Sequence, residues 1–489
     1  MKIPAATMRP LRLAGLGAAL LASGAAWGGD MAPTPEGASA LTAFLSGLLG
    51  APVGGADSSV SVKSEASGYA VTVDVGAMLK GAQALGVTYS GTPLTYHLVQ
   101  QTDGLWRVTA NGPFEINATM KEGTTKVRGE GLEYRSTFDP ATQWMRDAAF
   151  QIGAQTINVA FPGVTEAITV ASIKGDAKAT PADDGAMATD IAETFGAIMV
   201  KVAAAPKGAA APMAFSAKAQ GGDVKVGLQG ILPATALGLW RLVAANPQRA
   251  QMAAHESELK ALLSELASRA VGLKEDFTFD KVTVNAGPGD SSVEKVGGAV
   301  EIRASGPDSV FGESVSAEGL KLVKGLVPPA FAGLVPTAFA IGFKASGADV
   351  AAAAREAIAD LHLAGEGPPF SDADRDKIGA MLLGGGAVTV DIPASHVTAP
   401  KLDLGFEGQF RYVAGRPQGK LTAHARNFDA TVAAVAAVPG IDPSAGAVMA
   451  MAKGLGKAET DGALTWVLEV APDGAFSVNG TALGNIPVK

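Results

Sequence analysis

The chain has 489 residues, a formal net charge of −8, 61 glycines and no cysteine. The lack of cysteine excludes disulfides, thiolate metal sites and cysteine nucleophiles. The acidic balance argues against nucleic acid as a partner, because no Lys/Arg stripe with interleaved aromatics offsets the repulsion of phosphates. A length of this order usually forms two or three domains or one long repetitive one, and an aromatic content of only 6% suits close-packed sheets with thin Ala-rich helices.

The first residues have the pattern of a secretory signal. Basic residues, among them Arg9 and Arg12, precede an uncharged stretch over residues 13–27. That order matches a charged head followed by an apolar segment that is too short to favour spanning a membrane. The small residues at its end predict cleavage after Gly28, so residues 1–28 are the predicted signal peptide. The expected location of the mature chain is the periplasm.

Helical and strand patterns alternate through the N-terminal part of the chain. Thr34 as a cap, followed by leucines at helical spacing, predicts a helix that ends near Gly50. Over residues 60–174 the apolar side chains recur at every second position, which predicts half-buried antiparallel strands. The spacing over residues 191–202 then favours a helix.

A composition change marks the expected domain boundary. Residues 203–213 contain two prolines and a glycine and carry no periodic pattern. The sequence therefore predicts an N-terminal β-rich domain with helices over residues 29–205. It predicts a C-terminal α+β domain with strand-to-helix repeats over residues 206–489.

Strands repeatedly run straight into helical sequence. The strand segments that do so cover residues 69–75, 224–228, 339–343 and 421–425. Asp349 and Asp429 suit the helix N-caps in the last two units. The four units differ in spacing, so they do not demonstrate a duplication. The predicted fold class is α+β, with an extended, curved, mostly antiparallel β-sheet and Ala-rich helices in repeated strand-to-helix units.

No residue pattern predicts a catalytic, cofactor-binding or metal site. His255-Glu256 opens like a zinc-protease helix, but Leu259 stands where the second histidine is required. Glu130 and Glu133 are candidates for a glycosidase-type carboxylate pair, although surface charge is the stronger interpretation. None of the histidines falls within metal-ligand spacing of another. The five histidines are His97, His255, His362, His396 and His424.

The most informative segment is Leu326–Phe343, which contains no charged residue. Its length allows a membrane span, but three prolines interrupt a helix there and the apolar residues at its end alternate as in a strand. A buried strand is the favoured interpretation. Alternatively, the segment lines an apolar groove that binds a ligand. The candidate groove residues are Leu326, Phe331, Leu334, Phe339, Ile341 and Phe343.

The strand-to-helix units carry a family resemblance. Residues 335–343 (VPTAFAIGF) and 420–429 (KLTAHARNFD), with the closing run over residues 464–481, resemble uncharacterised secreted domain-of-unknown-function proteins of Gram-negative bacteria. Those proteins are similar in pattern to AsmA-like envelope proteins. The resemblance implies a β-rich envelope protein and lipid handling. A cleaved signal in place of the N-terminal anchor helix of AsmA-like proteins is a departure that puts a membrane-bridging role in doubt.

Together these patterns favour a non-enzymatic periplasmic protein that binds lipid or another apolar ligand on a curved sheet. The expected partners are a lipid or an envelope protein, with peripheral membrane contact allowed, no nucleic acid and no cofactor. The alternative is a periplasmic hydrolase that uses paired carboxylates. An outer-membrane β-barrel is a third interpretation, against which the sparse aromatics and the long helical patterns argue.

Overall fold

The computed structural model describes residues 33–49, 59–78, 86–205, 213–246, 248–287, 289–307, 309–365, 367–384, 388–413, 416–438 and 443–485. The predicted signal peptide therefore lies outside the described residues. The fold is α+β, as predicted, and its extended curved sheet has antiparallel strand pairs. The strand β14 leads into the helix α4 at Pro233, and the other three predicted strand-to-helix units also form.

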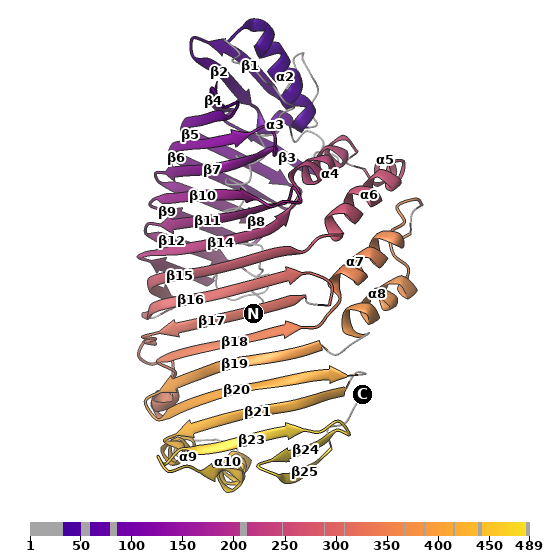
Figure 1. Ribbon diagram of the computed structural model, residues 1–489. Helices are drawn as coiled ribbons and strands as arrows, with labels where there is room; N and C mark the ends of the chain where they lie inside the picture. Colours follow the sequence, from indigo (N-terminus) through magenta and orange to yellow (C-terminus); the bar gives the residue numbers. More distant parts are fainter. Residues whose placement is uncertain are drawn as a thin grey trace. The chain divides into compact units, whose positions relative to one another are not determined.

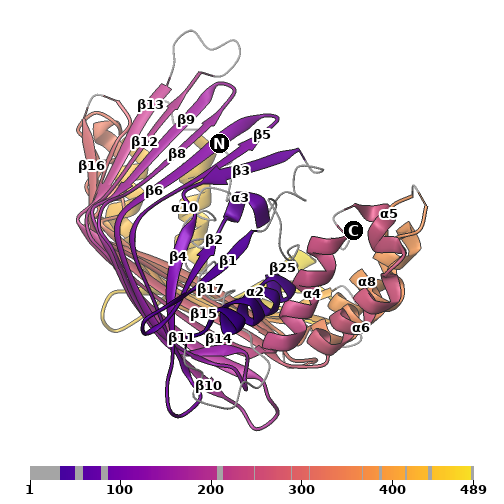
Figure 2. The same cartoon turned by 90° about the horizontal axis from the view of Figure 1, so that it is seen from above.

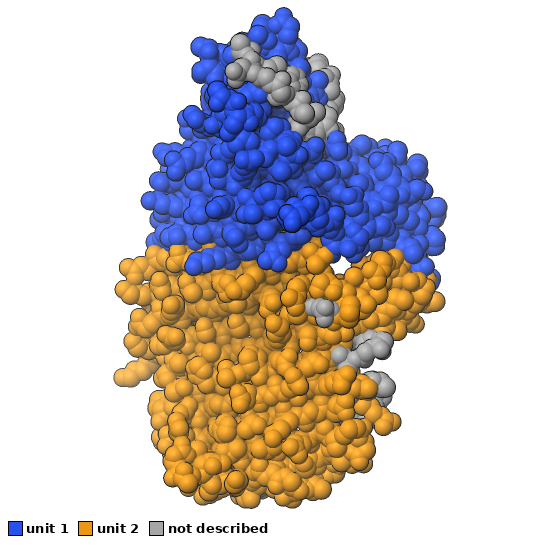
Figure 3. Space-filling view, in the orientation of Figure 1, with its two compact units in different colours: residues 1–214, 225–269, 358–371 blue, residues 215–224, 270–357, 372–489 orange. Residues whose placement is uncertain are grey.

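Contacts between Cα atoms divide the chain into two compact units, coloured separately in Figure 3. Unit 1 comprises Met1–Ala214, Lys225–Arg269 and Ile358–Ser371. Unit 2 comprises Phe215–Val224, Ala270–Ala357 and Asp372–Lys489. The predicted boundary at residue 205 remains a prediction.

Unit 1 holds most of the N-terminal strands and five helices among the described residues. The strands are β1 (Val60–Glu65), β2 (Gly68–Val73), β3 (Val87–Gly91), β4 (Leu94–Gln100), β5 (Trp106–Met120), β6 (Gly123–Asp139), β7 (Trp144–Ile152), β8 (Gln155–Phe161), β9 (Val164–Val170), β10 (Ile173–Pro181), β11 (Met187–Phe195) and β12 (Ile198–Ala204). The helices are α2 (Pro35–Leu49), α3 (Val75–Met78), α4 (Pro233–Ala245), α5 (Arg249–Ala253) and α6 (Glu256–Ala267).

Unit 2 is built mainly from the later strands. They are β15 (Val271–Asn285), β16 (Asp290–Ala304), β17 (Val310–Glu318), β18 (Ala338–Ser346), β19 (Val388–Ala399), β20 (Leu402–Val413), β21 (Arg416–Arg426), β22 (Lys457–Ala458), β23 (Leu464–Val470), β24 (Ala475–Val478) and β25 (Thr481–Asn485). Its helices are the 3-10 helix η2 (Pro329–Leu334), α8 (Asp372–Gly384), α9 (Phe428–Ala436) and α10 (Pro443–Leu455). Three elements have residues in both units: β13 (Met213–Ala219), β14 (Gly221–Ile231) and α7 (Val350–Ala359).

Two long strands shape the sheet of unit 1. β5 and β6 pair from Trp106 opposite Phe138 to Met120 opposite Gly123, with a register shift near Gly112. The C-terminal half of β6 continues the sheet through β7, whereas its N-terminal half pairs with β8. The sheet therefore has two arms that share β5 and β6, and Figure 2 shows these strands bending.

The core of unit 1 forms where apolar strand positions meet helix α2. The Thr34 hydroxyl accepts a hydrogen bond of 3.0 Å from the Gly37 N–H and so caps α2, as predicted. Leu45 of α2 packs in one buried cluster with Tyr69. A second cluster contains Ile157, which is 1% exposed. Burial of these side chains supplies the main driving force for folding this unit.

A short segment of unit 1, residues 358–371, is fastened to α5 and α6 by polar contacts. The Leu363 N–H donates to Glu256 Oε2 at 2.7 Å, and the Arg249 guanidinium donates to the Leu363 carbonyl at 3.0 Å. The hydrogen bond from Leu363, and next that from Lys260, lower the pKa of Glu256 below its ordinary value. The carboxylate form of Glu256 therefore favours the attachment of this segment.

The sheet of unit 2 is a meander. From β15 to β21 each strand pairs with the next in sequence, and β21 then pairs with β23, which continues through β24 to β25. Figure 1 shows this order in the lower strands of the view. The connections after β17, β18 and β21 contain helices, and the other connections of the meander from β15 to β21 are short.

Two predictions about local structure were wrong. Residues 191–202 form β11 and β12 instead of a helix, because Gly196 separates two short runs of β-branched and aromatic residues that prefer strands. The N-cap of α9 is Asn427 in the left-handed conformation, while Asp429 lies in the first turn and pairs with Lys453 at 2.6 Å. By contrast, Asp349 caps α7 as predicted, with its carboxylate 2.8 Å from the Ala352 N–H.

The segment Leu326–Phe343 is also different from the favoured expectation of one buried strand. Only its last six residues belong to a strand, β18, and that strand is half-exposed. The rest forms a turn and η2, because prolines cannot donate to a sheet and are kept out of its interior. Within the described parts of the chain, no helix has the length and apolar character needed to cross a membrane.

Candidate functional site

One face of the unit 2 sheet is apolar along its strands. In an antiparallel sheet, directly paired residues lie on the same face, so the register identifies which side chains are neighbours. One apolar row across five strands consists of Ile302, Phe311, Ala345, Val390 and Phe410. A second row on the same face consists of Phe279, Val296, Ala317, Phe339, Val397 and Leu404. These rows and those between them are called the apolar face.

The middle of the apolar face is open. Five large apolar side chains on the three neighbouring strands β16 to β18 are each 39–43% exposed. The rings of Phe311 and Phe343 contact each other there, with centroids 5.6 Å apart. These five residues, called the open patch, are Ile302, Phe311, Val315, Ile341 and Phe343. A contiguous group of exposed large apolar residues is typical of a surface that another molecule covers.

Helices α9 and α10 cover a different part of the same face. Trp466 of β23 lies in register with Ala423 on β21, which itself pairs with Phe406 on the apolar face. Its ring contacts Phe428 of α9 at a centroid distance of 5.2 Å, and its Nε1–H donates to the Ala452 carbonyl of α10 at 2.7 Å. The face is therefore closed by the protein's own helices at β23 and open at β16 to β18.

The opposite face of the sheet is polar. A row of paired positions crosses the strands there and contains Glu301, Gly312, Lys344, Asp391, Gln409, Lys420, Glu469 and Ser477. Lys344 Nζ lies 3.2 Å from Glu301 Oε2, and the Gln409 amide donates to Asp391 Oδ1 at 2.5 Å. These contacts are exposed, so each adds little stability, but they mark this face as the hydrated one. The sheet is consequently amphipathic.

Two carboxylates interrupt the apolar face. Glu275 on β15 and Glu313 on β17 both lie directly opposite Val300 of β16. Glu313 is exposed and is in turn opposite Phe343, within the open patch. Glu313 stands between Phe311 and Val315 on β17, so a ligand that covers the open patch must leave this hydrated carboxylate at its edge.

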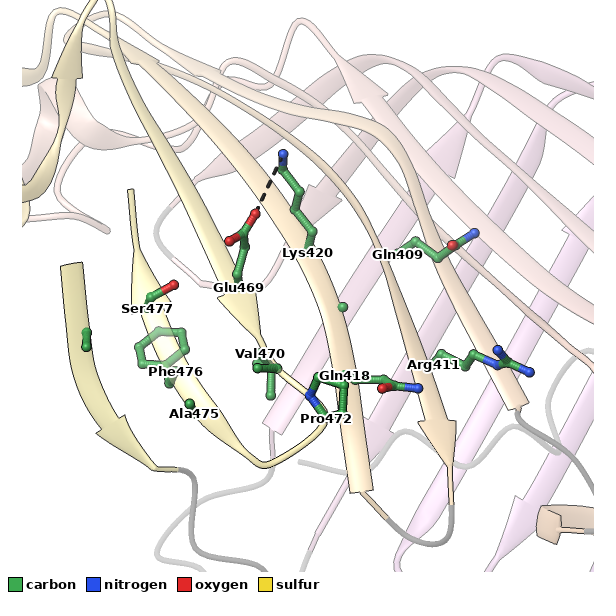
Figure 4. Close-up of a pocket in the computed structure, with 13 residues that line it drawn as sticks. Gln409, Arg411, Gln418, Lys420, Glu469, Val470, Pro472, Ala475, Phe476 and Ser477 are labelled. Atoms are coloured by element: carbon green, nitrogen blue, oxygen red, sulfur yellow. Dashed lines mark ion pairs between the residues drawn. The ribbon is translucent and has the colours of Figure 1, made fainter. Parts of the chain in front are cut away.

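A hollow of about 480 Å³ lies on the polar side near the C-terminal strands (Figure 4). Polar side chains of β20, β21 and β23 line it together with Phe476 and Val470. Figure 4 shows Lys420 and Glu469 pointing toward each other, with Nζ and Oε1 3.9 Å apart. Because opposite charges share one wall, the hollow does not select strongly for an anion or for a cation. The apolar face is the stronger candidate site.

The structure places the predicted groove residues in two groups. Phe339, Ile341 and Phe343 share the apolar face of β18. Leu326 belongs to an exposed turn, and Phe331 and Leu334 lie half-buried on η2. The residues of β16 and β17 in the open patch were missed. Their alternating sequence signals a strand, but nothing in the sequence shows that these strands are neighbours of β18.

The candidate glycosidase-type carboxylates both lie on β6 of unit 1. Glu130 and Glu133 are exposed, and Glu130 pairs with Arg128 at 3.4 Å. Among the described residues there is no group of three or more His, Asp or Glu that could hold a metal ion. Burial raises the pKa of Tyr134 to about 12, so this core tyrosine stays neutral near pH 7.

Fold and site define a class of protein: an α+β protein whose amphipathic sheet presents a partly open apolar face. Residues 203–487 match the family described as uncharacterized protein conserved in bacteria (DUF2125). The match covers more than half of the chain, so the protein belongs to this family. Comparison with curated proteins gave no match, and comparison with solved structures gave none either. The matched region includes all strands of the apolar face.

Proposed function

We propose that this protein binds the acyl chain of a lipid on the apolar face of the unit 2 sheet, and that the open patch is the centre of the site. The observation that carries the proposal is the exposure of five large apolar side chains on three adjacent strands. Their ordered register leaves the patch preformed, so little conformational entropy is lost when a ligand covers it.

The size of the open patch sets the affinity that its five side chains can supply. Five side chains of roughly 150–200 Å² each, about 40% exposed, offer roughly 350 Å² of apolar surface, which is worth on the order of 8 kcal/mol when covered. Association itself costs at least about 4 kcal/mol, so these five side chains alone support a dissociation constant of about 1 mM or weaker, and tighter binding requires contacts along the other rows of the apolar face. An acyl chain suits such a surface because it is apolar along its length and adapts to a row of side chains.

The proposal also covers where the protein is located and what class of protein it is. The predicted signal peptide supports export to the periplasm, where lipids pass between membranes. The resemblance of residues 335–343 and 420–429 to secreted proteins of AsmA-like pattern supports a lipid-handling role. In this interpretation the protein is a non-enzymatic envelope component.

The test is to purify the protein from the periplasm, extract it with organic solvent and identify bound molecules by mass spectrometry. The proposal predicts lipid in a fixed ratio to protein. A variant with Phe311 and Phe343 replaced by serine should lose that lipid while retaining its circular dichroism spectrum. If the purified, folded protein carries no lipid and takes none up from added vesicles, lipid binding is not its function.

A further inference from the structure

A tight turn precedes η2 in unit 2. The Leu326 N–H donates to the Val323 carbonyl at 3.2 Å, and Gly325 has a φ of +89°, as the third residue of a type II turn requires. Lys321 is joined to Ser292 by two backbone hydrogen bonds of 2.7 and 2.8 Å. The turn is therefore fixed to the sheet at its base.

The turn holds two leucines in solvent. Leu326 is 60% exposed and Leu322 is 36% exposed, whereas Val323 between them is half-buried. The Val323 N–H donates to the Ser291 hydroxyl at 3.2 Å, which keeps that residue against the sheet. An isolated exposed leucine is common on proteins, but here two exposed leucines lie four residues apart in one turn.

Two lysines alternate with the exposed leucines along the turn, and a third lies beside η2. Lys321 and Lys324 are exposed within the turn, and Lys401 lies beside η2, where its N–H donates to the Gly333 carbonyl at 2.9 Å. Lys321 pairs with Glu294 at 3.2 Å. In the part of the chain that the structure describes, no carboxylate forms an ion pair with the other two lysines. The turn is thus locally basic on a protein of net charge −8.

We propose that this turn docks unit 2 on an anionic lipid surface. Leu326 and Leu322 enter the boundary between head groups and acyl chains, and the lysines contact the negative head groups. The combination of apolar tip and basic flank fits an anionic membrane, which offers a hydrocarbon boundary and negative head groups together. This contact is separate from ligand binding on the apolar face, so either property could fail without the other.

The experiment is co-sedimentation of the purified protein with vesicles of phosphatidylcholine, alone and mixed with phosphatidylglycerol. We expect binding to the anionic vesicles that high salt weakens. Leu326→Ser should reduce the partition coefficient about tenfold and Lys324→Gln about fivefold. Leu326 is mostly exposed already, so the variant should unfold at the same temperature as the unmodified protein.

Matched controls lie elsewhere on the protein. Leu483→Ser changes a leucine that is 45% exposed on β25, and Lys63→Gln changes an exposed lysine of unit 1; both should bind vesicles normally. The proposal is overturned if Leu326→Ser and Leu483→Ser bind vesicles equally, or if the unmodified protein does not bind anionic vesicles. It is also overturned if light scattering shows a dimer that Leu326→Ser disrupts. Leu326→Ser should still bind a fluorescent acyl probe. If the unmodified protein sediments with anionic vesicles but does not bind the probe, that result counts against the acyl site alone.

Discussion

Replacing Phe343 by alanine removes one ring from the centre of the open patch. Phe343 is 39% exposed, so an acyl chain that covers it buries about 80 Å² of its roughly 200 Å² surface, worth about 2 kcal/mol. The dissociation constant of an acyl probe should therefore rise about 30-fold. The loss of the contact with Phe311 adds to this effect if that ring then shifts.

The assay is a titration of the protein with a fluorescent fatty acid, accompanied by thermal unfolding to verify the fold. Val243→Ala is the matched control, because Val243 is 44% exposed but lies on α4 in unit 1. Its probe affinity should equal that of the unmodified protein. A folded Phe343→Ala protein whose affinity changes by less than about twofold would refute the placement of the ligand. So would an equal loss in the Val243 variant.

Three further predictions concern stability. Ile157→Ala should lower the free energy of unfolding by about 2–5 kcal/mol in urea titrations, and a loss under about 1 kcal/mol would mean that this side chain is not in a core. Gly129→Ala should lower the Tm, because its Cβ would lie 2.2 Å from the Phe114 ring, whereas Gly454→Ala on α10 has open space and should not; equal Tm values for the two variants would contradict this packing. The lowered pKa of Glu256 means that its contribution to stability is present above its unfolded-state pKa and is lost as the pH falls through the folded-state value. Glu256→Gln should therefore flatten the dependence of Tm on pH in the acidic range, and an unchanged pH profile would show that the carboxylate has no such role.

The strands could be predicted from sequence where the apolar period is two, as at residues 69–73, because only that period puts alternate side chains on one face. Prediction failed at residues 191–202, where five apolar residues also fit helical spacing. Two features favour strands over a helix there. Gly196 separates the two apolar runs, and β12 pairs with β9, which is distant in the sequence. Helix starts were predictable where a side chain makes the cap, as at Asp349, but not at Asn427, where the backbone conformation marks the start.

The candidate site could be predicted only in part. Alternation in the last residues of Leu326–Phe343 identified the side chains that β18 presents together. The other half of the open patch comes from Ile302, Phe311 and Val315, and their contact with β18 depends on strand order and register. Register is decided by turn geometry and by burial of the whole sheet, which a local pattern does not contain.

The most direct test of the acyl site is photochemical labelling with a fatty acid that carries a diazirine on its chain, followed by peptide mapping. The account predicts labelled peptides from β16, β17 and β18, with labelling reduced in the Phe343→Ala protein. Labels confined to the polar face, to the hollow near Lys420, or to unit 1 would contradict the assignment of the apolar face as the ligand site.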